Sequence, residues 1–344
     1  MVIKRKTRTC SFSFNYKRLL ITFFFSIVLS PICTPFSTSA QYIYTDLNPG
    51  VDWHIYVHDI NDKGVVVGDV LFWGFLYSEG TYTELVLPGL DNAIPFGINN
   101  KGAVVGEGWF GFGIDQRGFL YSEGTYTVLL PPGWNSAIAY GINDKGAVVG
   151  YGYDGISQGA KGFLYNEGTY TKLLPPGWTY SWVYSINDKG AVVGWGYDAA
   201  SYPKGFLYSE GTYTELAPPG WDFVSACCLN NKGVVVGNGR DVEFDSIFKV
   251  FIYSEGTYAK LLPPGWASAT ASAINDKGVV VGYGIDGYGK HKGFLYSEGT
   301  YTELAPPGWV EVYPSAINDK GIVVGYGYDG SSVYFRAFMA TPSL

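Results

Sequence analysis

The stretch KGFLYSEGTYTELAPPGW, from Lys204 to Trp221, recurs letter for letter from Lys292 to Trp309. The two copies begin 88 positions apart, and a looser copy, KGFLYNEGTYTKLLPPGW, precedes them at Lys161 to Trp178. A second motif, Ile-Asn-Asp-Lys-Gly or a close variant of it, begins at residues 60, 98, 142, 186, 229, 274 and 317, with spacings of 38 to 45. A period in this range is typical of a propeller or a solenoid.

One repeat holds four short apolar runs and no helical periodicity. In the repeat that begins at Trp134 the runs are SAIAYGIN, GAVVGYGY, KGFLYNEG and TYTKLL, which are rich in β-forming residues. The segments Asn-Asp-Lys-Gly and Ser-Glu-Gly-Thr supply turn residues, with glycine at a positive φ, and Pro-Pro-Gly ends the unit because proline cannot donate to a ladder. Four antiparallel strands per repeat are the pattern of one β-propeller blade.

The number of blades follows from counting the motifs. Third-strand phenylalanines occur at residues 75, 119, 163, 206, 251, 294 and 338, but the fourth-strand motif occurs only six times after the first of them. The missing strand is at the other end of the chain, where YIYTDLNPG from Tyr42 aligns with TYTELAPPG. We expect an all-β, seven-bladed β-propeller of four-stranded antiparallel blades, closed by Tyr42 to Leu47 beside Arg336 to Thr341. It forms a single domain over residues 41–344, with blade repeats starting near 52, 90, 134, 178, 221, 266 and 309.

Residues 1–40 have the pattern of a secretory signal peptide. Six basic residues and no acidic ones precede or flank the apolar run Leu19 to Leu29, which is too short to span a bilayer. Small residues follow at Thr38, Ser39 and Ala40, so cleavage is expected near Ala40; an uncleaved anchor is the alternative. We expect a secreted, extracellular or periplasmic protein with no membrane span in its mature chain.

Charge and cysteine content then limit the partners. Loss of the six basic residues leaves 17 Lys and Arg against 30 Asp and Glu, a net charge near −13. Such a chain does not suit nucleic acids or an anionic membrane surface. Two of the four cysteines remain, the adjacent Cys227 and Cys228, which are not a disulfide framework. They are read as small-residue substitutions, with a vicinal disulfide as the alternative, and we expect a monomer.

The repeats resemble the extracellular HAF repeats, whose units carry A-x-x-I-N-x-x-G-x-V-V-G followed by a His-Ala-Phe segment and Leu-Tyr or Leu-Trp. The match covers residues 42 to 344. The triplet departs from the family pattern, because Lys161-Gly162-Phe163 and its equivalents keep the phenylalanine but replace the histidine; Arg336-Ala337-Phe338 is the nearest copy. The resemblance implies an exported, propeller-like repeat protein and brings no established reaction.

Candidate binding residues lie in the variable loops. Alternating strand directions place the two strict turns on one face and the variable loops on the other, where function usually resides. Five carboxylates recur four residues after the Val-Val-Gly glycine: Asp154, Asp198, Asp241, Asp286 and Asp329. They would suit Ca²⁺ or sugar hydroxyls, with Asp-Gly turn chemistry as the alternative. Five tryptophans follow Pro-Gly: Trp134, Trp178, Trp221, Trp266 and Trp309. They would stack on sugar rings, with packing between blades as the alternative.

Catalytic patterns are sparse. The sequence contains neither a triad signature nor a phosphate-binding loop, and His54 and His58 lie about 13 Å apart on a strand. We therefore expect a non-enzymatic protein that binds a glycan or a protein surface through the variable face, with no cofactor other than Ca²⁺. One alternative is an extracellular carbohydrate-active, or other hydrolytic or lyase, enzyme with its site at the central mouth. For that alternative the fifth blade is the only candidate, with the residues Arg240, Asp241, Glu243, Asp245 and Cys227. A purely structural or adhesive module is the other alternative.

Overall fold

The computed structural model describes residues 42–89, 91–110, 115–156, 159–241 and 247–343, all within the compact unit formed by residues 34–344. The predicted signal peptide (1–40) lies outside these residues, as do Leu90, Glu243 and Asp245. Every regular element in the described part of the chain is a β-strand. No helix long and apolar enough to cross a bilayer occurs in that part.

The described strands form seven four-stranded units, numbered I to VII here. Unit I comprises β2 (Ile55–Ile60), β3 (Val66–Val70), β4 (Trp73–Ser78) and β5 (Thr81–Glu84). Unit II comprises β6 (Asn92–Ile98), β7 (Val104–Phe110), β8 (Asp115–Ser122) and β9 (Thr125–Leu129). Unit III comprises β10 (Ser136–Ile142), β11 (Val148–Tyr153), β12 (Lys161–Asn166) and β13 (Thr169–Leu173). Unit IV comprises β14 (Trp178–Ile186), β15 (Val192–Asp198), β16 (Pro203–Ser209) and β17 (Thr212–Leu216).

The remaining three units follow the same plan. Unit V comprises β18 (Trp221–Leu229), β19 (Val235–Asp241), β20 (Lys249–Ser254) and β21 (Thr257–Leu261). Unit VI comprises β22 (Trp266–Ile274), β23 (Val280–Asp286), β24 (His291–Ser297) and β25 (Thr300–Leu304). Unit VII comprises β26 (Glu311–Ile317), β27 (Val323–Tyr328) and β28 (Arg336–Pro342), together with β1 (Tyr42–Asp46).

All units are antiparallel, and unit VII is built from both ends of the described chain. Strand β1 pairs with β28, from Tyr42 opposite Pro342 to Asp46 opposite Phe338. It therefore occupies the place that the sequence predicted for the missing fourth strand. Five units are separate sheets, whereas units I and II share one sheet through a single parallel bridge between Trp73 and Ala93.

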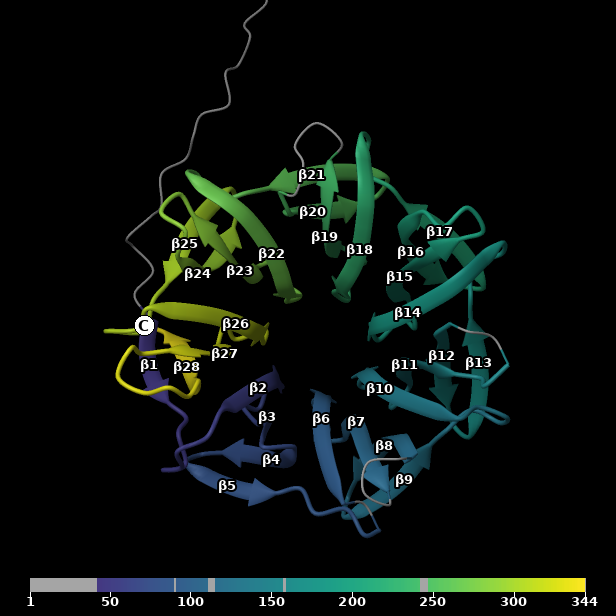
Figure 1. The fold of residues 1–344 in the computed structure, drawn as a ribbon, viewed down its shortest axis with the longest axis horizontal. Coiled ribbons are helices and arrows are strands. Elements are labelled where there is room, and N and C mark those ends of the chain that lie inside the picture. The colour runs from purple at the N-terminus through teal and green to yellow at the C-terminus, as the bar shows by residue number, and fades with distance from the viewer. Residues whose placement is uncertain (1–41, 90, 111–114, 157–158, 242–246, 344) are drawn as a thin grey trace, which may run out of the picture. The chain divides into compact units, whose positions relative to one another are not determined.

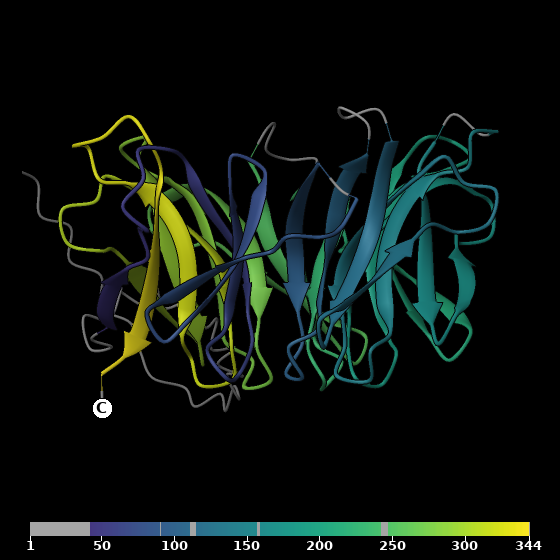
Figure 2. The same ribbon diagram turned by 90° about the horizontal axis from the view of Figure 1, so that it is seen from below.

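The units are arranged around a central axis, with the first strand of each unit nearest to it (Figure 1). The strands run between two opposite faces (Figure 2). We call the face that carries the Asn-Asp-Lys-Gly turns the turn face, and the face that carries the variable connections the loop face. The residues of the first strands that point inward therefore line the axis.

The core lies between neighbouring units. One of its clusters joins Leu173 of unit III to Val183 and Phe206 of unit IV. The Val-Val-Gly glycine is needed because the third-strand phenylalanine packs directly against it. A Cβ atom on Gly106, for example, would lie 2.0 Å from the carbonyl oxygen of Ile94 and 2.8 Å from the ring of Phe119. The repeat thus encodes close approach of backbone and ring as well as the turns.

Candidate functional site

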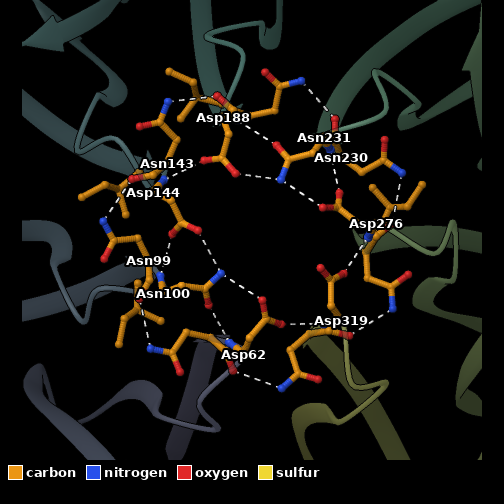
Figure 3. Close-up of a pocket in the computed structure, with 18 of the residues that line it drawn as sticks. Asp62, Asn99, Asn100, Asn143, Asp144, Asp188, Asn230, Asn231, Asp276 and Asp319 are labelled. Carbon is orange, nitrogen blue, oxygen red and sulfur yellow. Dashed lines mark hydrogen bonds between the residues drawn. The ribbon is translucent and has the colours of Figure 1, made fainter.

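A ring of buried asparagines surrounds the axis at the turn face. Its members are the asparagines of the repeated Ile-Asn motif: Asn61, Asn99, Asn143, Asn187, Asn230, Asn275 and Asn318. Each Nδ2 donates to the backbone oxygen of the next member at 2.9–3.0 Å, and Asn318 donates to Asn61 (Figure 3). Each Oδ1 accepts from backbone N–H groups of its own turn, as Asn143 does from Lys145 and Ala147. Each amide has partners at both its nitrogen and its oxygen, so we assign the ring a structural role.

A second tier of side chains follows the asparagine ring toward solvent. It consists of the next residue in each turn: Asp62, Asn100, Asp144, Asp188, Asn231, Asp276 and Asp319. Each backbone N–H donates to the Oδ1 of the next member, and Asp319 donates to Asp62 at 2.8 Å. Asn100 and Asn231 also donate from Nδ2 to the carboxylates on both sides. Asp319 has an aspartate on each side, and burial together with these two charges raises its pKa.

The two tiers enclose a cavity of about 180 Å³. In the described ranges no three His, Cys, Asp or Glu side chains are grouped so that they could hold a metal ion. The hydrogen bonds from each turn to the next make the tiers the hub that joins the units.

A larger cavity of about 370 Å³ lies further along the axis, and we call it the axial pocket. It shares five aliphatic residues of the repeat with the cavity of the polar tiers: Ile142, Ile186, Leu229, Ile274 and Ile317. Its wall contains, from all seven units, the residue two positions before the repeat aliphatic: His58, Phe96, Tyr140, Tyr184, Cys227, Ser272 and Ser315. These positions depart from the repeat, whereas the turns beneath them are nearly identical.

Ionisable groups gather on the side of the axial pocket formed by units I and II. His58 Nε2 lies 2.7 Å from Asp69 Oδ1, and Asp59 accepts backbone hydrogen bonds from Ile60 and Ile98. Burial raises the pKa of Asp59 to about 6 despite these bonds. The Asp59 carboxyl group can therefore hold or release a proton near pH 6.

Glu107 adds a second carboxyl group with a raised pKa. Its side chain is buried, and Gln116 Nε2 donates to its Oε2 at 2.5 Å. Burial, with a contribution from the charge of Asp69, raises the pKa of Glu107 to about 7. A neutral, protonated Glu107 is therefore well populated at physiological pH.

Aromatic side chains form the wall from unit II to unit IV. The ring of Tyr140 stacks on Phe96 at 4.6 Å and meets Tyr184 edge-on at 5.1 Å. Trp182 stacks on Trp195 at 4.7 Å on the neighbouring stretch of the first two strands of unit IV. The opposite wall, from units V to VII, has the small side chains of Cys227, Ser272 and Ser315. The pocket is thus asymmetric although the scaffold is repetitive.

Cys227 and Cys228 are both free thiols on the wall of the axial pocket. Their sulfur atoms are 2.9 Å apart, and Cys228 Sγ donates to the backbone oxygen of Ser272 at 2.9 Å. The hydrogen bond with Cys227 and burial raise the pKa of Cys228, so its thiol stays protonated.

The five predicted loop aspartates each interact within their own loop. Asp198 and Asp286 each accept two backbone hydrogen bonds from the residues two and four positions on. Asp154 accepts one from Ile156, and Asp329 accepts from two backbone groups of its turn and pairs with Arg336. Asp241 is buried beside Lys249 at 2.7 Å. Each of these contacts is a turn or ion-pair contact within a single unit.

The five predicted tryptophans pack edge-on against the third-strand phenylalanine of their own unit, with ring centroids 5.6–6.1 Å apart. The tryptophan ring also covers a second-strand glycine. A Cβ atom on Gly152, for example, would lie 2.9 Å from the ring of Trp134. The packing alternative describes their surroundings, because each tryptophan also belongs to a core cluster that joins its own unit to the preceding one.

The sequence interpretation used His58 only to exclude a shared metal, and it did not consider Asp59, Asp69 or Glu107. It considered only the fifth repeat, where Arg240 forms an exposed ion pair with Asp222 at 3.1 Å. The structure places His58, Asp59 and Asp69 in unit I and Glu107 in unit II. The sequence did contain a signal for them, because the residues at these positions differ from those at the equivalent positions of the other repeats.

Comparison with known proteins identifies the fold and no family. No protein-family model matches the chain, and no curated protein matches it. Among solved structures, it is similar to the β-propeller domain of the Trilobed protease from Pyrococcus furiosus. That match has a TM-score of 0.56 and 11% identity, and covers 84% of this chain and 94% of the other.

Two further solved structures give the same result. An acylaminoacyl peptidase matches with a TM-score of 0.51 and 12% identity, over 83% of this chain and 54% of the other. The extracellular domain of a putative one-component system from B. thetaiotaomicron matches with a TM-score of 0.51 and 10% identity, over 87% and 39%. At this identity the likeness shows the fold alone. The chain has a β-propeller fold of antiparallel four-stranded sheets.

Proposed function

We propose that the chain is an exported, closed seven-bladed β-propeller of the HAF-repeat type that binds a glycan on its loop face, with the axial pocket as the central subsite. The seven units would be the blades, and β1 would close the ring beside β28. The pairing of β1 with β28 and the hydrogen bond from Asn318 to Asn61 support closure. The apolar run near the N-terminus supports export.

One observation carries the functional proposal: the residues that depart from the repeat gather on the axis. A scaffold that needed only to fold would gain nothing from five different residue types at seven equivalent positions. The axial pocket combines aromatic faces at Tyr140 and Tyr184 with polar groups at His58, Asp59 and Ser185. Sugar rings present apolar faces to aromatic side chains and hydroxyl groups to polar ones. This combination fits a glycan better than it fits a purely apolar or strongly charged ligand.

The proposal is tested by calorimetric titration of oligosaccharides into residues 41–344. Tyr184→Ala and His58→Ala should each weaken binding at least tenfold, because each removes a wall of the axial pocket. Asp154→Asn and Asp286→Asn, in the presence and absence of Ca²⁺, form the comparison arm for the loop carboxylates. If binding persists in both axial variants and is lost in the loop variants, the glycan site lies in the loops. If the wild-type protein binds none of the glycans, the proposal is wrong.

A hydrolase with its site at the central mouth is the second candidate. The raised pKa of Glu107, about 7, favours it, because a general acid must carry its proton near neutral pH. Asp69, whose charge acts on Glu107, would be the partner carboxylate. Release of reducing sugar that is lost in Glu107→Gln and retained in Arg240→Ala would support this function. Binding without any turnover would exclude it.

A further inference from the structure

Two residues before its third-strand phenylalanine, unit I has a residue type that differs from those of all other units. In units II to VII this position holds a base: Arg117, Lys161, Lys204, Lys249, Lys292 and Arg336. Unit I has Trp73 there instead. The aromatic ring is 63% exposed, so it is not a replacement that fills the core.

In other units this base neutralises an acid on the same blade surface. Lys204 Nζ lies 3.0 Å from Glu215, and Lys292 Nζ lies 2.6 Å from Glu303. The two glutamates occupy one register position, opposite the third-strand phenylalanine. Glu84 occupies that same position in unit I, opposite Phe75. With Trp73 in place of the base, Glu84 has no ion-pair partner among the described residues.

Trp73 and Glu84 line a cavity of about 240 Å³ between β5 and the start of β6. Asp91 and Asn92 also line it, as does Val86, which is 70% exposed. The Oδ1 atom of Asn92 is enclosed and has no hydrogen-bond partner within the described ranges. The cavity therefore combines an exposed indole, two carboxylates and an amide.

The turn before Trp73 holds its strand in a costly conformation. Leu71 and Phe72 connect β3 to β4 with φ values of 51° and 71°, in the left-handed region that bulky residues avoid. Strained backbone of this kind persists only where the surrounding structure enforces it, and it is common at ligand sites. The residue that follows this short connection is Trp73, which is 63% exposed.

We propose that this cleft binds an organic cation of the alkylammonium class, which takes the place of the base that unit I lacks. The cation would lie on the face of Trp73 and pair with Glu84, since an ammonium ion is attracted both to an indole face and to a carboxylate. The net negative charge of the chain favours the approach of such a ligand. The site shares no lining residue with the axial pocket and is independent of the glycan proposal.

The test uses ¹⁹F NMR of residues 41–344 labelled with 5-fluorotryptophan, with the Trp73 resonance assigned from Trp73→Phe. Choline and n-butylammonium are the probes, and 3,3-dimethyl-1-butanol is the neutral isostere of choline. We expect the Trp73 resonance to shift with both cations, with Kd in the millimolar range that one cation–π contact and one ion pair support. A preference for choline would indicate a quaternary headgroup as the natural source, and a preference for butylammonium a lysine side chain.

Variants separate the site from general effects. Trp73→Lys restores the pair seen in units IV and VI, so it should abolish binding while the protein keeps its melting temperature. Glu84→Gln should weaken binding about tenfold, whereas its counterpart Glu303→Gln in unit VI should leave the affinity within about twofold. An equal shift with the neutral isostere, unchanged affinity in Trp73→Lys or Glu84→Gln, or no shift at about 100 mM cation would each overturn the proposal.

Discussion

Replacement of one ring asparagine tests how much the hub of the fold contributes to stability. Asn143→Ala removes three hydrogen bonds: the donation to the Asn187 oxygen at 2.9 Å and the acceptance from Lys145 and Ala147 at 3.1 and 2.9 Å. Lys145 is exposed, so water can hydrogen-bond to its backbone N–H in place of Asn143. Ala147 is buried, so its backbone N–H would stay without a partner. The Asn187 oxygen keeps a second hydrogen bond, from Gly190.

The expected loss follows from these partners. An unsatisfied buried N–H costs about 1–3 kcal/mol, and one lost amide-to-carbonyl bond costs about 1 kcal/mol. Asn143→Ala should therefore lower the free energy of unfolding by about 2–4 kcal/mol. Urea unfolding of residues 41–344, followed by tryptophan fluorescence, measures this directly. The adjacent Lys145→Ala is the matched control and should change stability by less than about 0.5 kcal/mol, because its side chain is exposed.

Asn143→Asp sharpens the test, since it keeps the acceptor and replaces only the donor. At pH 7 a carboxylate oxygen would face the Asn187 oxygen, so the loss should exceed that of Asn143→Ala. The loss should shrink in acid, where a protonated carboxyl can donate again. A cost below about 1 kcal/mol for Asn143→Ala, or a stable Asn143→Asp at pH 7, would refute the reasoning.

Three further changes have definite expected outcomes. The pKa of Glu107 is raised from 4.5 to about 7, so folding binds a proton and stability falls as pH rises between these values. Glu107→Gln should remove that fall and be more stable than wild type at pH 8, by about 2 kcal/mol in urea unfolding; an unchanged pH profile would contradict this. The double variant Leu71→Asn, Phe72→Gly should relieve the left-handed turn by about 1 kcal/mol per residue, and a lower melting temperature would contradict it. Deletion of residues 42–46 should lower the melting temperature by well over 5 °C, because it exposes the edge of β28; an unchanged value would contradict closure.

The repeat was readable from the sequence because its turns are chemically strict. The asparagine and glycine of each Asn-Asp-Lys-Gly turn form the bonds and the positive φ that were predicted, with Gly146 at 87° and hydrogen-bonded to Asn143. The second turn differs in one respect. Glu167 shares the positive φ with Gly168, at 48° and 85°, as a two-residue hairpin requires at both central positions.

The residues that line the axial pocket could not be predicted from strand alternation, because the first strand of every unit has a register shift near its C-terminal end. The register shifts between Val57 and Asp59 in unit I, and at the equivalent place in unit III between Ala139 and Gly141. At such a bulge two consecutive residues can face the same side, as His58 and Asp59 both do. A period of two therefore assigns one of them to the wrong side.

The loop residues were ambiguous in the sequence for a different reason. An aspartate after an apolar strand caps its own turn as readily as it binds a ligand, and Asp286 does the former with Tyr288 and Lys290. A recurring tryptophan is equally ambiguous until its neighbours are known. Trp178 lies against Phe206 at 5.8 Å, which only the third strand of its own unit could reveal.

The most direct test of the account is a comparison of glycan affinity between axial and loop variants of residues 41–344. We predict that calorimetry with the tightest-binding oligosaccharide gives at least a tenfold loss for Tyr184→Ala and less than a twofold change for Asp286→Asn. Full affinity in Tyr184→Ala, with loss of binding in Asp286→Asn, would contradict the claim that the residues departing from the repeat form the site.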